Sequence, residues 1–108
     1  KYVISGSSDS TLKVWDLQSG EILRTLTGHR SWVNAVATTS DSKYIISGSW
    51  DNTLKVWNWQ TGEVIATFTG DSAIGCCAVV GDRLTIVAGE QSGQLHFLQL
   101  EGVQSGTI

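Results

Sequence analysis

The chain has 108 residues, 16 % of them charged, and its seven basic and ten acidic residues give a net charge of −3. The basic residues are scattered and form no positive stripe that could neutralise a phosphate backbone, so we expect no nucleic-acid partner. No apolar run approaches the roughly 18 residues of a membrane-spanning helix, and no basic-then-apolar leader opens the sequence. We therefore expect a folded cytoplasmic protein that makes no membrane contact.

The first predicted elements are a β-hairpin and a third strand. Residues 2–7 and 11–17 are rich in β-branched and aromatic side chains, and Ser8, Asp9 and Ser10 between them favour a turn. A second turn at residues 18–21 leads into a strand at residues 22–26.

A fourth strand is predicted at residues 32–38, before the chain turns back at residues 39–42. Its apolar residues Val33, Ala35 and Val36 break strict alternation, which predicts a β-bulge near Asn34 and Ala35. No segment shows a helical period, so we expect an all-β protein.

The same pattern then recurs. Residues 44–70 repeat residues 2–28 at an offset of 42, with 17 of 27 positions identical. A weaker third copy at residues 86–98 matches residues 45–57 at an offset of 41 and keeps Gly89 and Leu95 in register. A fixed period of this length is typical of a repeat architecture.

The strand predicted at residues 53–59 is apolar on both faces. Leu54 and Val56 point to one side, whereas Trp57 and Trp59 point to the other. Such a strand must be covered twice. Four-stranded sheets that stack face to face in this way are typical of a β-propeller. A solenoid is the alternative, although all-β solenoid repeats are usually shorter.

These repeats resemble the WD-repeat family of β-propellers. The matching features are Gly28-His29 at the start of a unit, Trp15-Asp16 at the end of one, and Asp9 and Asp51, each six residues before the closing Trp. The second unit departs from the pattern by ending in Trp57-Asn58. The third departs further, with substitutions at the expected His, Ser, Asp and Trp positions: Asp71, Ala88, Ser92 and Leu98.

The resemblance implies WD-repeat blades, each a four-stranded antiparallel sheet. Residues 1–108 would then form a single partial propeller of about two and a half to three blades. We expect an incomplete blade at 1–27, a complete repeat at 28–69, a degenerate last repeat at 70–100 and a C-terminal tail at 101–108. The chain would be the C-terminal part of a larger propeller, closed by missing repeats or by self-association.

The resemblance also implies a structural tetrad of His29, Ser47, Asp51 and Trp57. The indole N–H can only donate and the carboxylate can only accept, whereas the hydroxyl and the imidazole can do both, so a chain of hydrogen bonds can close. The first repeat has a partial set, Ser5, Asp9 and Trp15, whose His would precede residue 1. The third repeat has none of the set.

Trp32, Asn34 and Trp50 are the candidate protein-binding residues, since they occupy the loop face on which the family commonly meets its ligands. Trp50 is informative because its counterpart in the first copy is Ser8. Large aromatic side chains are frequent in binding hot spots. The alternative is that Trp32 and Trp50 pack on each other and on Arg30.

The resemblance implies a non-catalytic scaffold that binds other proteins or peptides, such as the sensor or docking arm of a larger signalling protein. The alternative is a propeller module of a hydrolase, because Ser47, His29 and Asp51 are also the ingredients of a catalytic triad. No G-x-S-x-G motif supports that alternative.

We expect no cofactor and no metal. His96 has no neighbour at metal-ligand spacing and is interpreted as a packed or edge imidazole on a strand. Cys76 and Cys77 are adjacent, which disfavours an ordinary disulfide between them, so we expect both thiols to be at least partly buried.

Overall fold

The computed structural model describes residues 1–81 and 85–99, which form ten β-strands in three antiparallel sheets. The predicted tail at 101–108 lies outside the described residues. The first sheet contains β1 (Tyr2–Gly6), β2 (Thr11–Asp16) and β3 (Ile22–Thr27). The second contains β4 (Val33–Thr38), β5 (Tyr44–Ser49), β6 (Thr53–Asn58) and β7 (Glu63–Thr69). The third contains β8 (Ile74–Val80), β9 (Thr85–Glu90) and β10 (Leu95–Gln99).

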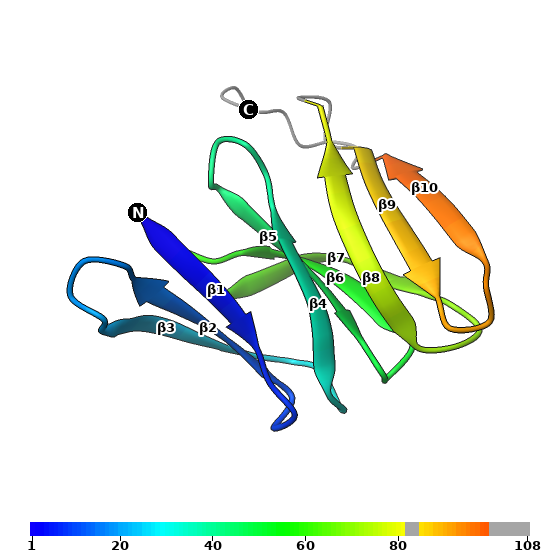
Figure 1. Cartoon of the computed structure of the whole chain (residues 1–108), viewed down its shortest axis with the longest axis horizontal. Helices are drawn as coiled ribbons and strands as arrows, with labels where there is room; N and C mark the ends of the chain where they lie inside the picture. Colours follow the sequence, from blue (N-terminus) through cyan, green and yellow to red (C-terminus); the bar gives the residue numbers. More distant parts are fainter. Residues whose placement is uncertain (82–84, 100–108) are drawn as a thin grey trace.

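The sheets stand side by side like part of a fan (Figure 1). Within each sheet the strands follow chain order, so every connection joins neighbours. β1, β4 and β8 are the first strands of the three sheets, and β4 lies between β1 and β8 and contacts both (Figure 1). Among the described residues there is no helix long and apolar enough to cross a membrane.

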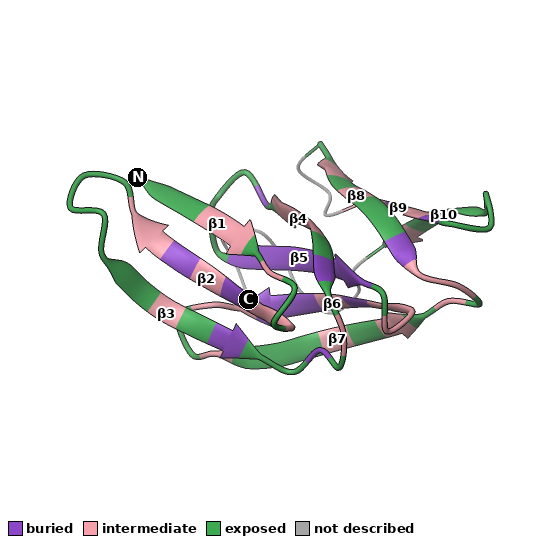
Figure 2. Cartoon of the chain, turned by 60° about the horizontal axis from the view of Figure 1, so that its bottom comes forward, coloured by how far each residue is buried: buried purple, intermediate pink, exposed green. Residues whose placement is uncertain are grey.

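The second sheet is covered on both faces, as the sequence predicts. One face packs Leu54 and Val56 against Ile86 of the third sheet. The other face packs Trp57 against Leu12 of the first sheet, with Trp59 at the edge of the same cluster. All six residues of β5 are buried, and Figure 2 shows the burial concentrated in β5 and β6.

Bulges recur at equivalent positions of the first two sheets. The predicted bulge in β4 is confirmed by the register shift between Val33 and Ala35. The shift between Val14 and Trp15 in the first sheet recurs between Val56 and Trp57 in the second. A bulge re-aims the side chain beside it.

Two glycines allow adjacent sheets to touch. A Cβ on Gly48 in β5 would lie 2.6 Å from Ile74 Cγ2, and a Cβ on Gly6 in β1 would lie 2.8 Å from Val33 Cγ1. Both positions carry glycine in the repeated Ser-Gly-Ser run. The same glycine in the first two repeats therefore permits the close approach of each sheet to the next.

The third sheet corrects one expectation about the cysteines. Cys77 is half-buried, its Sγ lies 3.9 Å from the Ile46 carbonyl oxygen, and burial raises the pKa of its thiol to about 12. Cys76 is exposed, so the prediction that both thiols are partly buried is wrong for Cys76. Neighbouring residues on a strand point to opposite faces, so only Cys77 faces the second sheet.

Candidate functional site

Four side chains from the second repeat form one hydrogen-bonded chain. The indole Nε1 of Trp57 in β6 donates to Ser47 Oγ in β5 over 2.8 Å. Ser47 Oγ lies 2.6 Å from His29 Nε2, and His29 Nδ1 lies 2.9 Å from Asp51 Oδ2. The loop before β4, the two central strands and the turn between them are thereby joined.

The carboxylate of Asp51 can only accept, so the Nδ1–H of His29 donates to it. In the neutral ring Nε2 then accepts from the Ser47 hydroxyl, whose oxygen accepts the indole N–H of Trp57. Burial lowers the pKa of His29 and outweighs the opposing hydrogen bond to Asp51. No buried side-chain nitrogen or oxygen of the described residues lacks a hydrogen-bond partner.

Asp51 is the acceptor at which this chain of bonds ends. Its carboxylate also accepts the backbone N–H groups of Arg30 and Thr53, each over 2.9 Å, and the Thr53 hydroxyl. Burial raises the pKa of Asp51, but the hydrogen bonds from Thr53, Arg30 and His29 outweigh it and lower the pKa below the ordinary 3.8. Sequence reasoning missed Thr53, although both repeats carry Asp-x-Thr at this turn.

The partial set in the first sheet is only half joined. Trp15 Nε1 donates to Ser5 Oγ over 2.9 Å, as in the second sheet. Asp9 accepts the N–H and hydroxyl of Thr11, as Asp51 does from Thr53, and these bonds hold its pKa at about 2. The Asp9 side chain is 58 % exposed, compared with 10 % for Asp51.

The third sheet has a different polar cluster, which sequence reasoning missed. The buried carboxylate of Glu90 accepts the N–H groups of Asp71 and Ser72, the Ser72 hydroxyl, and a hydrogen bond from His96 Nε2. The bond from His96 is the main cause of the lowered pKa of Glu90. A Cβ on Gly70 would lie 2.6 Å from Glu90 Oε2, so the carboxylate needs glycine there.

His96 thus serves as a packed imidazole, and its ring lies 4.7 Å from that of Phe68 in β7. Across the described parts of the chain, no three His, Cys, Asp or Glu side chains gather where they could hold a metal ion. The only signal for the Glu90 cluster is that Glu90 and His96 stand where the second repeat has Ser49 and Lys55.

The order of hydroxyl, imidazole and carboxylate also matches a catalytic triad. In this chain, however, Ser47 is fully buried and its oxygen already accepts the indole N–H of Trp57, which is itself fully buried. A nucleophile must reach a substrate carbonyl, and Ser47 has no open side from which to do so. The geometry therefore supports a structural network.

Trp32 and Trp50 lie against each other on the loop face. Their rings are nearly parallel at 8°, with centroids 4.6 Å apart. The backbone N–H of Trp50 donates to the backbone carbonyl of Trp32 over 2.9 Å. Trp32 is nonetheless 49 % exposed and Trp50 is 44 % exposed. Asn34 is exposed at the bulge of β4 and lines a separate shallow hollow of about 290 Å³ with Gly6 and Val33.

Replacing Asp51 with alanine should destabilise the chain by about 1–3 kcal/mol, since the donors of His29, Arg30 and Thr53 would lose their acceptor in a buried site. Urea unfolding followed by circular dichroism measures the change. Asp9→Ala is the matched control and should cost less, because that carboxylate is exposed. Equal losses for the two variants would contradict the tetrad.

Stability should also fall on acidification below pH 6.5, the ordinary pKa of histidine. The lowered pKa keeps folded His29 neutral where the unfolded chain takes up a proton, so unfolding becomes easier by up to about 1.4 kcal/mol per pH unit. Above that pH the contribution is constant. Asp51 and Glu90 also have lowered pKa values, so the stability that they contribute is lost only at more acidic pH, below their ordinary pKa values of 3.8 and 4.5.

Urea midpoints measured at intervals between pH 7.5 and about pH 5 test this dependence. His29→Gln should flatten the curve in that window, since glutamine cannot take up the proton. An unchanged slope in His29→Gln would show that another group causes it.

Comparison with known proteins agrees with the repeat and the fold. The family profile described as "WD domain, G-beta repeat" matches residues 1–16 and 20–58, about half of the chain. The β-propeller domain of Cps50 (Swd1) from Myceliophteria thermophila superposes with a TM-score of 0.84 and 18 % identity, covering 93 % of this chain and 32 % of that one. That likeness establishes the propeller fold.

Curated relatives match over single repeats. Nuclear distribution protein PAC1 of Mycosarcoma maydis is 44 % identical over 43 residues, which are 40 % of this chain and 10 % of that protein. Pre-mRNA-splicing factor PRP46 of Debaryomyces hansenii is 48 % identical over 40 residues, 37 % of this chain and 10 % of that protein. The match spans about a tenth of the length of these relatives. With its family profile, the hydrogen-bonded chain of Trp57, Ser47, His29 and Asp51 and its stacked four-stranded unit, the chain belongs to the WD-repeat family of β-propellers.

Proposed function

We propose that the chain is a non-catalytic, cytoplasmic protein-binding scaffold that presents the Trp32–Trp50 pair to a partner protein or peptide. The observation that carries the proposal is the exposure of both indole rings in a fixed, stacked arrangement. WD-repeat propellers typically act as interaction scaffolds, and their matching repeats occur in proteins of different processes. The chain would serve as the sensor or docking arm of a larger signalling protein.

The rigidity of the pair favours binding. The Asp51 carboxylate accepts the N–H of Arg30, two residues before Trp32, and it also holds the hairpin that bears Trp50. The backbone bond between Trp50 and Trp32 fixes the two loops to each other. An aromatic surface that is already ordered loses little conformational entropy when a partner binds.

Asn34 belongs to the same proposal as a polar contact at the rim of the loop face. Asn34 is exposed at the β4 bulge. The backbone N–H of its neighbour Val33 donates to the carbonyl of Ser7, which follows β1. An exposed amide can donate and accept hydrogen bonds with a peptide backbone. Asn34 would add specificity to the binding energy of the rings.

The sheets at the two ends of the fan leave apolar faces uncovered. Leu95 and Phe97 in β10 are 57 % and 70 % exposed, and Val3 and Leu23 of the first sheet are 44 % and 46 % exposed. Large exposed apolar faces favour association. We propose that further repeats or other copies of the chain cover them, with residues 1–27, 28–69 and 70–100 contributing successive blades.

The role of the tryptophans is tested with peptides selected by phage display on the immobilised chain. Trp50→Ser, which installs the residue of the first repeat, should weaken the selected peptides by about thirtyfold, as expected for a hot spot of about 2 kcal/mol. Leu17→Ser, an exposed apolar change elsewhere, should leave binding unaltered. Peptides that bind the Trp50→Ser chain as tightly as the parent would refute the proposed surface.

Light scattering tests the uncovered faces. The chain alone should show a mass above the 11.6 kDa of one copy, rising with concentration, and Phe97→Ser should reduce the association because it removes the most exposed of these side chains. A folded species that stays at the mass of one copy at every concentration would count against self-association.

A further inference from the structure

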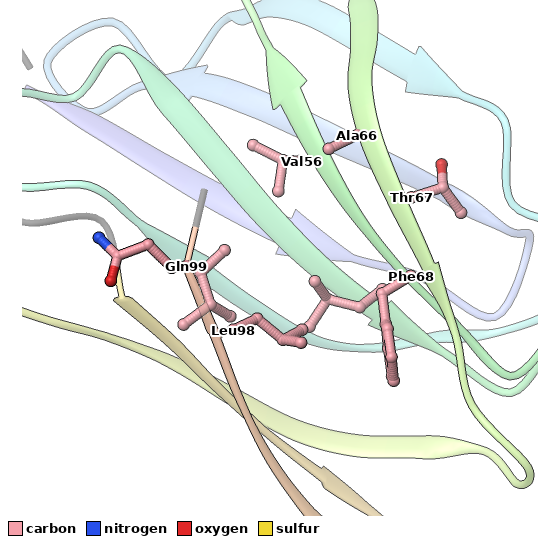
Figure 3. Close-up of a pocket in the computed structure, with 8 residues that line it drawn as sticks. Val56, Ala66, Thr67, Phe68, Leu98 and Gln99 are labelled. Atoms are coloured by element: carbon pink, nitrogen blue, oxygen red, sulfur yellow. The ribbon is translucent and has the colours of Figure 1, made fainter. Parts of the chain in front are cut away.

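An apolar groove of about 160 Å³ lies between the second and third sheets (Figure 3). β6 and β7 supply Val56, Ala66 and Phe68 to one side, and β10 supplies Leu98 to the other. Gln99 of β10 and Thr67 of β7 also line the groove. β10 and β7 are the last described strands of their sheets.

The repeat explains why this space is open. At the interface of the first and second sheets, the equivalent position is filled by the indole of Trp57, which is fully buried. Leu98 stands where Trp57 stands, and Leu54, Val56 and Ile86 match Leu12, Val14 and Ile45 of the filled interface. The groove is thus the same interface with a smaller side chain in the indole position.

The polar partner of the indole is lost together with the indole. Ser47, which accepts the Trp57 N–H, is replaced by Ala88, which is fully buried. Phe68 is larger than its counterpart Leu26 and takes part of the space, with its ring against His96. What remains is a groove whose lining is apolar except for Thr67 and Gln99.

We propose that this groove binds a small, flat, apolar aromatic molecule of about indole size. The filled interface shows that two such sheets accept an aromatic ring between them, and the groove continues the interface of the second and third sheets. A cavity of about 150 Å³ lined by Leu, Ile and Phe is large enough to bind benzene. We expect a flat ring in preference to an aliphatic chain because the equivalent space in the filled interface holds the indole of Trp57. The site is separate from the Trp32–Trp50 surface and does not depend on the proposed function.

Indole itself is the probe, added to the 108-residue chain while thermal unfolding is followed by circular dichroism. Indole should raise the melting temperature saturably, by about 5 °C at ten times its Kd. The methyl NMR signals of Val56 and Leu98 should shift over the same concentration range. Hexanol, an aliphatic probe, should have a smaller effect.

The variants locate the effect. Leu98→Trp, alone or combined with Ala88→Ser to supply the indole N–H with its acceptor, should refill the groove and abolish the response. Ala66→Leu narrows the groove from β7 and serves should Leu98→Trp not fold. Trp50→Ser should retain the full response, which separates this groove from the exposed tryptophan pair.

Four results would overturn the proposal: no saturable shift with indole, an equal shift in the parent and in folded groove-filling variants, a response lost in Trp50→Ser but kept in Leu98→Trp, or an equal response to hexanol. Loss of peptide binding in Trp50→Ser has no bearing on these outcomes, so each proposal can fail by itself.

Discussion

The need to cover both faces of the second sheet determines the rest of the structure. Leu54 and Val56 require the third sheet, and Trp57, one residue further along the same strand, requires the first. Removing a buried side chain as large as Trp typically costs about 3–5 kcal/mol, a substantial part of the roughly 5–15 kcal/mol that stabilises a domain. A sheet of this kind has no stable form in isolation, and the radial stack follows because every repeat presents the same two faces to its neighbours.

Placing an indole in such an interface brings a polar N–H into it, and the tetrad is the consequence. Ser47 accepts that N–H, His29 accepts from Ser47, and Asp51 ends the chain near the surface, where backbone N–H groups also reach it. The third sheet shows the converse. Once Leu98 replaces the indole, the serine and histidine are no longer required, and the loop before β8 is held instead by the carboxylate of Glu90. In both sheets a carboxylate thus accepts N–H groups of the loop before the first strand: Arg30 in the second sheet, and Asp71 and Ser72 in the third.

The parts of the structure that repeat could be predicted from the sequence, and the parts that occur once could not. Strand alternation and the two-faced pattern of residues 53–59 predict the sheets and their stacking, and the broken alternation at Ala35 predicts the bulge. Glu90 could not be predicted as buried, because a carboxylate is normally solvated and its burial here depends on Gly70 and on donors from a separate loop. The sequence leaves the mutual packing of Trp32 and Trp50 open as one alternative, but the backbone bond that joins their two loops leaves no local pattern.

The residues that differ from the repeat pattern fall into two classes. For some of them other residues of the chain replace the lost contacts, and for others none do. The loss of His and Ser in the third repeat is compensated, since Glu90 and His96 supply a complete polar cluster of their own. Two changes are left without such compensation. Trp50, in the place of Ser8, stacks on Trp32 and leaves both rings nearly half exposed. Leu98, in the place of Trp57, leaves an apolar space beside it. The residues that the repeats share stabilise the sheets and their stacking. A position that is not needed for this stacking can therefore change and come to bind a partner while the propeller keeps its fold.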